Sequence, residues 1–310
     1  MTQMRASSSG PSAPVQSVRG LLTATTAALG SGPEARWIVA HATGVRAGDL
    51  VTRLDVAVAP EVSDTVQDMV DRRLSGEPLQ YVLGTWAFRT LEIRVDRRVL
   101  IPRPETELVV AAALDELRMQ EGGVPEGSKL VAVDLGTGAG AIALSLASEF
   151  ESATPLEVWA TDVSTDVLDV VELNLAALGA RRPHAARRVR VASGWWFDAL
   201  PADLAGEVRL VVSNPPYVTA AEWEALDPVV REHEPVGALV PGPTGLEAID
   251  VILDGARQWL GPGGSLVVEL APGQAASVAG RAAELGYVEP AVRDDLAGRR
   301  RMLVTRTPGR

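Results

Sequence analysis

The sequence predicts an α/β protein with a doubly wound, mostly parallel sheet, preceded by a small helical domain and a linking β-hairpin. Two observations lead to this prediction. From residue 130 onward, near-continuous apolar segments that are typical of buried parallel strands alternate with helical segments. Residues 17–77 instead carry apolar side chains at helical spacing. In doubly wound sheets ligands bind beyond the carboxyl ends of the strands, so the loops that follow strands are the candidate site.

Composition excludes several functional classes. The 310 residues include no cysteine and three histidines without metal-binding spacing, so we expect no disulfide, cysteine nucleophile or metal site. The net charge of −11 disfavours a stable nucleic-acid partner. No apolar run is long enough to span a membrane, and the N-terminus lacks a signal-peptide pattern. We therefore expect a cytoplasmic protein without a membrane partner.

The first part of the chain divides into a tail and a helical domain. Residues 1–16 are rich in Ser and Pro, and we expect them to be disordered. Residues 17–84 predict short helices, in which Ser31 and Glu34 form a capping box and Gly76 ends a third helix. Three short helices bury little surface by themselves. We therefore expect this domain to dock onto or recognise a partner.

Residues 85–108 predict a β-hairpin and linker. Leu91, Ile93 and Val95 alternate with charged residues, which is the periodicity of a strand. A helix is expected after the linker, with Glu105 and Glu107 in its first turn, where the helix dipole favours anions.

Residues 109–310 predict the main α/β domain. Its expected strands lie within residues 130–136, 156–163, 189–194, 210–218, 264–270 and 300–307. Its expected helices lie within residues 141–150, 165–178, 245–260 and 275–286.

A glycine-rich loop follows the first of these strands, and its residues are Gly136, Thr137, Gly138, Ala139 and Gly140. Glycines allow a tight turn and let the backbone approach a ligand closely. The spacing also satisfies a dinucleotide fingerprint. However, Asp134 would place a carboxylate near a pyrophosphate, whereas a cationic sulfonium tolerates it. Asp162 ends the second strand and can accept hydrogen bonds from ribose hydroxyls, which occurs equally in nucleoside and dinucleotide sites. Because of Asp134 we expect a nucleoside-type cofactor.

A second motif, Asn214-Pro215-Pro216-Tyr217, follows the fourth strand of this domain. The two prolines stop the strand and remove two N–H donors, which leaves outward carbonyls, an amide and an aromatic face. These groups suit a planar amine or amide. The Asn214 oxygen and the Pro215 carbonyl would accept its two N–H hydrogens, while Tyr217 would stack on its plane. Acceptors on both hydrogens activate and orient the nitrogen.

Together the two motifs resemble class I S-adenosylmethionine-dependent methyltransferases, which have a Rossmann-like sheet. Several further segments look like the PrmC/HemK family: Gly76 to Tyr81, Gly84 with Phe88, Leu100 to Glu107 (LIPRPETE), Glu234-Pro235, Ala238-Leu239 and Gly245-Leu246. Members of that family methylate the glutamine of the GGQ loop in class I peptide-chain release factors. The resemblance covers residues 17–306 and implies S-adenosyl-L-methionine as cofactor and a release factor as partner. Nothing in the sequence requires more than a monomer, which is the state we expect.

The resemblance also implies roles for individual residues. The cofactor site would comprise Gly136, Thr137, Gly138, Ala139, Gly140, Asp162, Trp196 and Asn214. The substrate site would comprise Asn214, Pro215, Pro216 and Tyr217, with Phe88 and Arg103 nearby; Asn214, Pro215 and Tyr217 would be catalytic. One position departs from the family pattern, because Trp195 stands where many relatives carry an acid. We weigh core packing and a place beside the cofactor equally for Trp195.

Two alternatives remain at this point. The Asn-Pro-Pro-Tyr corner also occurs in enzymes that methylate adenine N6 or guanine N2 in nucleic acids. The second alternative is a nucleoside-binding module without catalytic activity.

Overall fold

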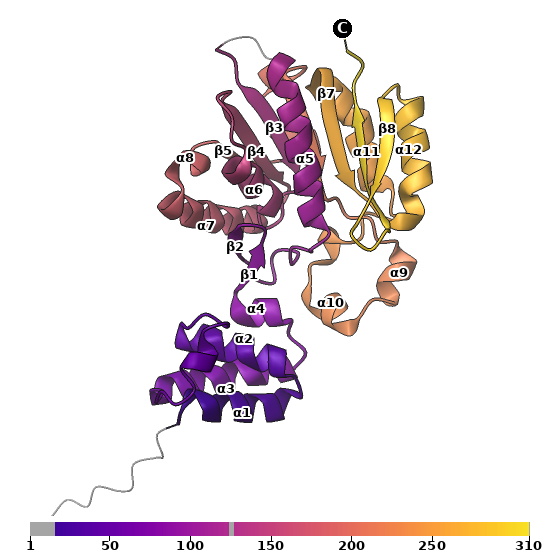
Figure 1. Ribbon diagram of the computed structural model, residues 1–310. Coiled ribbons are helices and arrows are strands. Elements are labelled where there is room, and N and C mark those ends of the chain that lie inside the picture. The colour runs from indigo at the N-terminus through magenta and orange to yellow at the C-terminus, as the bar shows by residue number, and fades with distance from the viewer. Residues whose placement is uncertain (1–15, 124–126, 310) are drawn as a thin grey trace, which may run out of the picture. The chain divides into compact units, whose positions relative to one another are not determined.

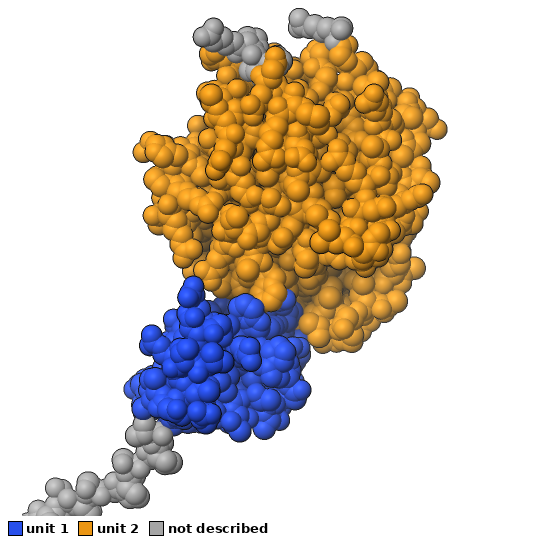
Figure 2. Space-filling model, in the orientation of Figure 1, with its two compact units in different colours: residues 1–83 blue, residues 84–310 orange. Residues whose placement is uncertain are grey.

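The computed structural model describes residues 16–123 and 127–309. The chain forms two compact units, residues 1–83 and residues 84–310, which are coloured separately in Figure 2. The boundary adjoins the one expected after residue 84. The predicted disordered tail, residues 1–16, lies outside the described residues except for Gln16.

The first unit is helical. Its elements are α1 (Val18–Leu29), α2 (Gly32–Thr43), the 3₁₀ helix η1 (Leu50–Thr52), α3 (Pro60–Leu74) and α4 (Leu79–Leu83). Ser31 caps α2 by accepting from the amide of Glu34 at 3.4 Å. The Glu34 carboxylate does not complete the expected capping box, because it binds the guanidinium of Arg73 on α3 at 2.9 Å. Gly76 lies just beyond α3, with a φ of 97° that suits glycine.

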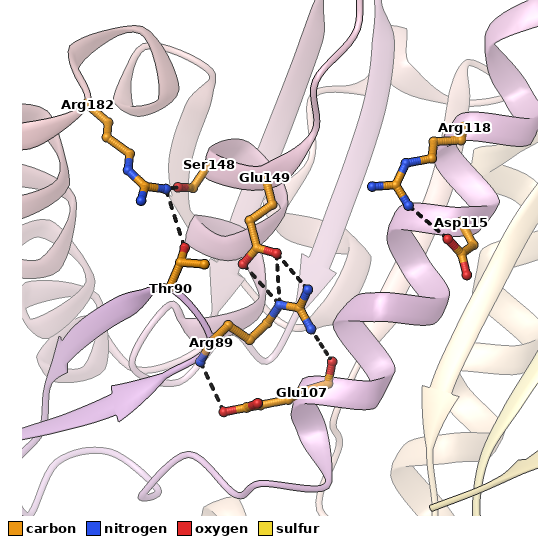
Figure 3. A network of polar contacts seen from close by, with 8 residues as sticks. All are labelled: Arg89, Thr90, Glu107, Asp115, Arg118, Ser148, Glu149 and Arg182. Carbon is orange, nitrogen blue, oxygen red and sulfur yellow. Dashed lines mark hydrogen bonds and ion pairs between the residues drawn. The ribbon is translucent and has the colours of Figure 1, made fainter.

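The second unit begins with a β-hairpin of β1 (Thr85–Phe88) and β2 (Leu91–Arg94). Figure 3 shows how the turn of this hairpin is held. Arg89 occupies the left-handed region at a φ of 50°. Its guanidinium binds the Glu149 carboxylate at 2.6 Å, and its amide donates to the Glu107 carboxylate at 3.0 Å. Arg182 reaches Thr90 and Ser148 beside this pair.

The sequence predicted that both Glu105 and Glu107 lie in the first turn of the helix after the linker. The helix, α5 (Thr106–Gln120), begins one residue after Glu105. Glu105 is the N-cap residue, but its side chain makes no capping bond and instead pairs with Arg299 at 3.0 Å. Glu107 lies in the first turn and anchors the hairpin turn. Both acids therefore connect distant segments in addition to lying at a helix N-terminus.

The second unit contains a seven-stranded sheet in the order β5-β4-β3-β6-β7-β9-β8. The strands are β3 (Leu130–Leu135), β4 (Leu156–Asp162), β5 (Val189–Ser193), β6 (Val208–Ser213), β7 (Leu260–Glu269), β8 (Val288–Asp294) and β9 (Arg300–Arg306). The strands from β5 to β7 are parallel, and β9 runs antiparallel to both β7 and β8. The mostly parallel, doubly wound sheet is thus confirmed.

Strand β8 was not predicted. It lies at the edge of the sheet, and Pro290 within it cannot donate to a ladder. Its register shifts between Val288 and Ala291, where Glu289 adopts a φ of 52°. An interrupted edge strand with charged residues carries little of the apolar pattern on which sequence reasoning depends.

Helices cover both faces of the sheet. Figure 1 shows α5 across the near face. The helices α11 (Glu247–Trp259) and α12 (Ala275–Glu284) share an apolar cluster with Val131, Val133 and Leu135, the alternate side chains of β3. The remaining helices are α6 (Ala141–Glu149), α7 (Thr165–Arg181), α8 (Pro183–Ala186), α9 (Ala220–Glu224) and α10 (Pro228–His233). Short 3₁₀ helices are η2 (Glu121–Gly123), η3 (Trp196–Ala199), η4 (Ala202–Leu204), η5 (Val236–Ala238) and η6 (Pro272–Gln274). Within residues 16–123 and 127–309, no helix is long and apolar enough to cross a membrane.

Candidate active site

A cavity of about 560 Å³ opens at the carboxyl ends of β3, β4, β5 and β6. Its volume lies within the range of small-molecule sites. Parallel strands bring the loops that follow them to one edge of the sheet, and β3 lies where the strand order reverses. Loops that are distant in sequence therefore meet around one cavity.

The glycine loop forms one wall of this cavity, which Gly136, Thr137, Gly138 and Ala139 line. Gly136 and Gly138 have φ values of 67° and 53°, which glycine adopts without strain. A Cβ at Gly138 would meet no atom within 4 Å, so this backbone is open to a ligand. Gly140, at a φ of 82°, ends the turn and is not among the lining residues.

Two carboxylates hold the glycine loop: Asp134 is buried and Asp162 is half-buried. Asp162 lines the cavity, and its two oxygens accept from the amides of Gly138 at 3.2 Å and Ser164 at 3.1 Å. Burial raises the pKa of Asp162. Each carboxylate oxygen has a second lone pair, so Asp162 can still accept from a ligand hydroxyl.

Asp134 differs from its expected position, because it is fully buried and does not line the cavity. It accepts from the Thr137 hydroxyl at 2.6 Å and from the Ala143 amide at 3.1 Å. Burial raises the pKa of Asp134 to about 7. Its carboxyl group therefore fixes the turn from within and does not lie beside a bound ligand, contrary to the prediction from the sequence.

Two tryptophans after β5 form another wall. Gly194 allows this turn, because a Cβ there would lie 2.5 Å from the Ala199 nitrogen. Trp196 has a φ of 48°, and its buried Nε1 has no hydrogen-bond partner among the described residues. Trp195 lies edge-on to it, with ring centroids 5.9 Å apart, and is 60% exposed. Core packing of Trp195 is therefore wrong, since the side chain lines the cavity.

The Asn-Pro-Pro-Tyr corner contributes to the cavity through Asn214 and Pro216. Pro215 is buried behind them. Tyr217 does not line the cavity; its hydroxyl donates to the Glu269 carboxylate at 3.2 Å. The Tyr217 ring packs against the apolar cluster that contains the β3 side chains, and its stacking on a substrate stays a prediction.

The hairpin and linker residues also differ from expectation. Phe88 is 1% exposed and does not line the cavity, so the structure gives it a core position rather than a substrate contact. The Arg103 guanidinium binds Glu234 at 2.6 Å, and Glu234 also accepts from the Ile101 amide at 3.2 Å. Arg103 thereby ties the linker to the loop after α10 and is not among the lining residues.

Sequence reasoning missed three side chains that support this site. Thr106 lines the cavity and binds both Asn214 and Glu269. Asn174 on α7 accepts from the Arg94 amide at 2.7 Å and donates to the Ala139 carbonyl at 2.9 Å, so it joins the hairpin to the glycine loop. Glu269 ends an apolar strand with a carboxylate, which is a signal that could have identified it; Thr106 and Asn174 carry no comparable signal.

The residues present fit a nucleoside-type ligand. Aromatic and aliphatic side chains supply apolar walls, Asp162 supplies an acceptor, and the open backbone at Gly138 allows close approach.

Comparisons with known proteins agree with this geometry. Residues 26–84 match the family model for the PrmC N-terminal domain, and residues 120–232 match the methyltransferase small domain. The chain is 36% identical over 272 residues to the release factor glutamine methyltransferase of Rhodopirellula baltica, with 87% of each chain covered. Identity is 37% over 275 residues to that of Cereibacter sphaeroides, covering 89% of this chain and 91% of the relative. Identity to the release factor glutamine methyltransferase of Streptomyces coelicolor is 38% over 274 residues, covering 88% of this chain and 90% of the relative.

Proposed function

The chain belongs to the release factor glutamine methyltransferase family, and we propose that it methylates the side-chain amide nitrogen (N5) of the glutamine in the GGQ loop of class I peptide-chain release factors. It is an enzyme that uses S-adenosyl-L-methionine. The observation that most supports the proposed reaction is that the glycine loop, Asp162 and Asn214 line one cavity.

In this proposal the glycine loop and Trp196 would hold the cofactor. Asp162 accepts from the ribose hydroxyls. The bound cofactor supplies an electrophilic methyl group on a sulfonium.

Asn214 and Pro215 act on the nucleophile. An amide nitrogen is weakly nucleophilic because its lone pair is delocalised into the carbonyl. The Asn214 side-chain oxygen and the Pro215 carbonyl accept its two hydrogens, which raises electron density on nitrogen and aligns it. The amide group of Asn214 donates to Thr106 at 3.1 Å, which leaves its oxygen for the substrate. Tyr217 supports the corner from behind by its bond to Glu269.

We expect Asp162→Ala to weaken cofactor binding about 10- to 100-fold, equivalent to roughly 1.5–3 kcal/mol, because two charge-assisted hydrogen bonds are lost. Calorimetric titration with S-adenosyl-L-methionine measures the affinity. Asp169→Ala is the matched control, since Asp169 is an exposed acid on α7 that does not line the cavity. Equal affinities for the two variants would contradict the proposed ribose contact.

Mass spectrometry of the release factor tests the reaction. We expect incubation with enzyme and cofactor to add one methyl group to the glutamine of the GGQ peptide. Parallel incubations with DNA and RNA test base methylation, and label transferred to nucleic acid alone would overturn the proposal. The proposal includes a monomeric enzyme in the cytoplasm that has no stable nucleic-acid partner.

A further inference from the structure

A buried chain of hydrogen bonds lies behind Asn214. Its amide nitrogen donates to the Thr106 hydroxyl at 3.1 Å, and that hydroxyl donates to the Glu269 carboxylate at 2.7 Å. Tyr217 donates to the other oxygen of Glu269 at 3.2 Å. Thr106 is 4% exposed and Glu269 is 1% exposed, so solvent competes little for these bonds. The chain joins the start of α5, the loop after β6 and the end of β7.

The donors and acceptors in this chain can be assigned. A threonine hydroxyl has one hydrogen, and while Glu269 is ionised that hydrogen goes to its carboxylate. The Thr106 oxygen can then only accept from Asn214. The atom of Asn214 that faces Thr106 must therefore be the amide nitrogen, and the side-chain oxygen is directed elsewhere.

We infer that Thr106 and Glu269 are positioning residues that fix the amide orientation of Asn214, so that its oxygen and not its NH2 group is offered to the substrate. This inference rests on the proposed function, in which Asn214 accepts a hydrogen from the glutamine amide. A reversed Asn214 amide would present donors to a substrate NH2 group, which is also a donor. The correct orientation therefore decides whether the corner can bind the nucleophile.

The ionisation of Glu269 bears on this orientation. Burial raises the pKa of Glu269 to about 7, and Glu105 acts in the same direction. Arg301 on β9 opposes this, as do the hydrogen bonds from Thr106 and Tyr217. Arg301 is itself paired with Asp295 at 3.4 Å, and Glu105 is paired with Arg299.

When Glu269 is ionised, it accepts from both hydroxyls and the orientation is fixed. When it is protonated, its own O–H can donate to Thr106, whose hydrogen is then free to donate to the Asn214 oxygen. The fixed orientation is therefore present above the pKa of Glu269 and is lost as the pH falls through about 7.

The sequence offers a direct test by NMR, because Asn174 and Asn214 are its two asparagines. Protein labelled with 15N-asparagine has two side-chain NH2 signal pairs. In the wild type we expect the Asn214 pair to titrate with a midpoint near pH 7, while Asn174 serves as an internal control of the fold. We expect Glu269→Gln to abolish the titration and Thr106→Val to shift the Asn214 pair at every pH. Thr106→Ser, which keeps the hydroxyl, should resemble the wild type.

Methylation rates provide the second measurement. At saturating cofactor and a pH above about 8, we expect Thr106→Val to lower the rate about 10- to 100-fold and to change cofactor affinity less than about twofold. Thr106→Ser should recover most of the rate. Glu269→Gln should be slow throughout, without the decline toward acid pH that the wild type shows.

The two measurements separate failure of this inference from failure of the proposed function. An Asn214 pair that neither titrates nor responds to Thr106→Val would overturn the inference, even if release factor is methylated normally. Equal methylation rates for Thr106→Val and Thr106→Ser would also overturn the inference. Absence of methylation by the wild type, with the NMR response as expected, would instead contradict the proposed function.

Discussion

Replacing Asn214 with alanine is expected to slow methyl transfer to release factor at least about 100-fold, which corresponds to roughly 3 kcal/mol of transition-state stabilisation. The substitution removes an oxygen that orients the glutamine nitrogen and accepts one of its hydrogens. Cofactor affinity should fall much less, because the glycine loop and Asp162 remain. Single-turnover methylation at saturating S-adenosyl-L-methionine measures the rate, and calorimetry measures the affinity.

Asn214→Asp is the companion variant. It keeps oxygen acceptors but places a negative charge beside the sulfonium and the amide. We expect cofactor binding at least as tight as in the wild type, with a rate that remains low because alignment is disturbed. A rate near that of the wild type for Asn214→Ala would mean that the corner does not orient the nucleophile.

Removal of the first unit is expected to abolish methylation of intact release factor while leaving cofactor affinity nearly unchanged. Among the described residues, all those that line the cavity beside the glycine loop belong to residues 84–310. The helical unit instead exposes large apolar side chains, among them Val51 and Leu74, which are 61% and 60% exposed. We propose that this unit recognises the protein substrate.

The truncated form should begin after Leu83, so that α4 is removed together with the other helices of the first unit. Arg72 binds the Glu77 carboxylate at 2.8 Å and the Tyr81 carbonyl at 3.0 Å, so α4 belongs with the helices. Calorimetry with S-adenosyl-L-methionine checks that residues 84–310 remain folded. A short GGQ peptide is the control substrate, which both forms should methylate equally. Equal rates for both forms on folded release factor would contradict substrate recognition by the first unit.

The parts of the site that could be predicted are those in which the local sequence determines the backbone. Glycines after an apolar strand and two prolines after another locate the two loops, and parallel strand order brings them to one edge of the sheet. The substrate contacts expected of Phe88 and Tyr217 could not be predicted in this way, because they depend on the direction in which each side chain points. Both side chains turn toward the interior, and that depends on packing between segments distant in the sequence.

The supporting network could not be predicted for a related reason. Thr106 and Glu269 are 163 residues apart, and nothing in either local sequence indicates that they share a hydrogen bond. The edge strand β8 was not predicted because a proline and charged residues interrupt its apolar pattern. Contacts of this kind form only when the sheet is assembled, so the local sequence does not predict them.

The contact between Asn174 and the hairpin has a consequence for amide hydrogen exchange. The amide of Val95 donates to the Gly84 carbonyl at 3.0 Å, so its protection reports on opening of the hairpin itself. The amide of Arg94 donates instead to the side chain of Asn174 on α7. Exchange at Arg94 therefore reports on separation of the hairpin from α7. Two neighbouring amides thus distinguish fraying of the hairpin from its detachment as an intact unit.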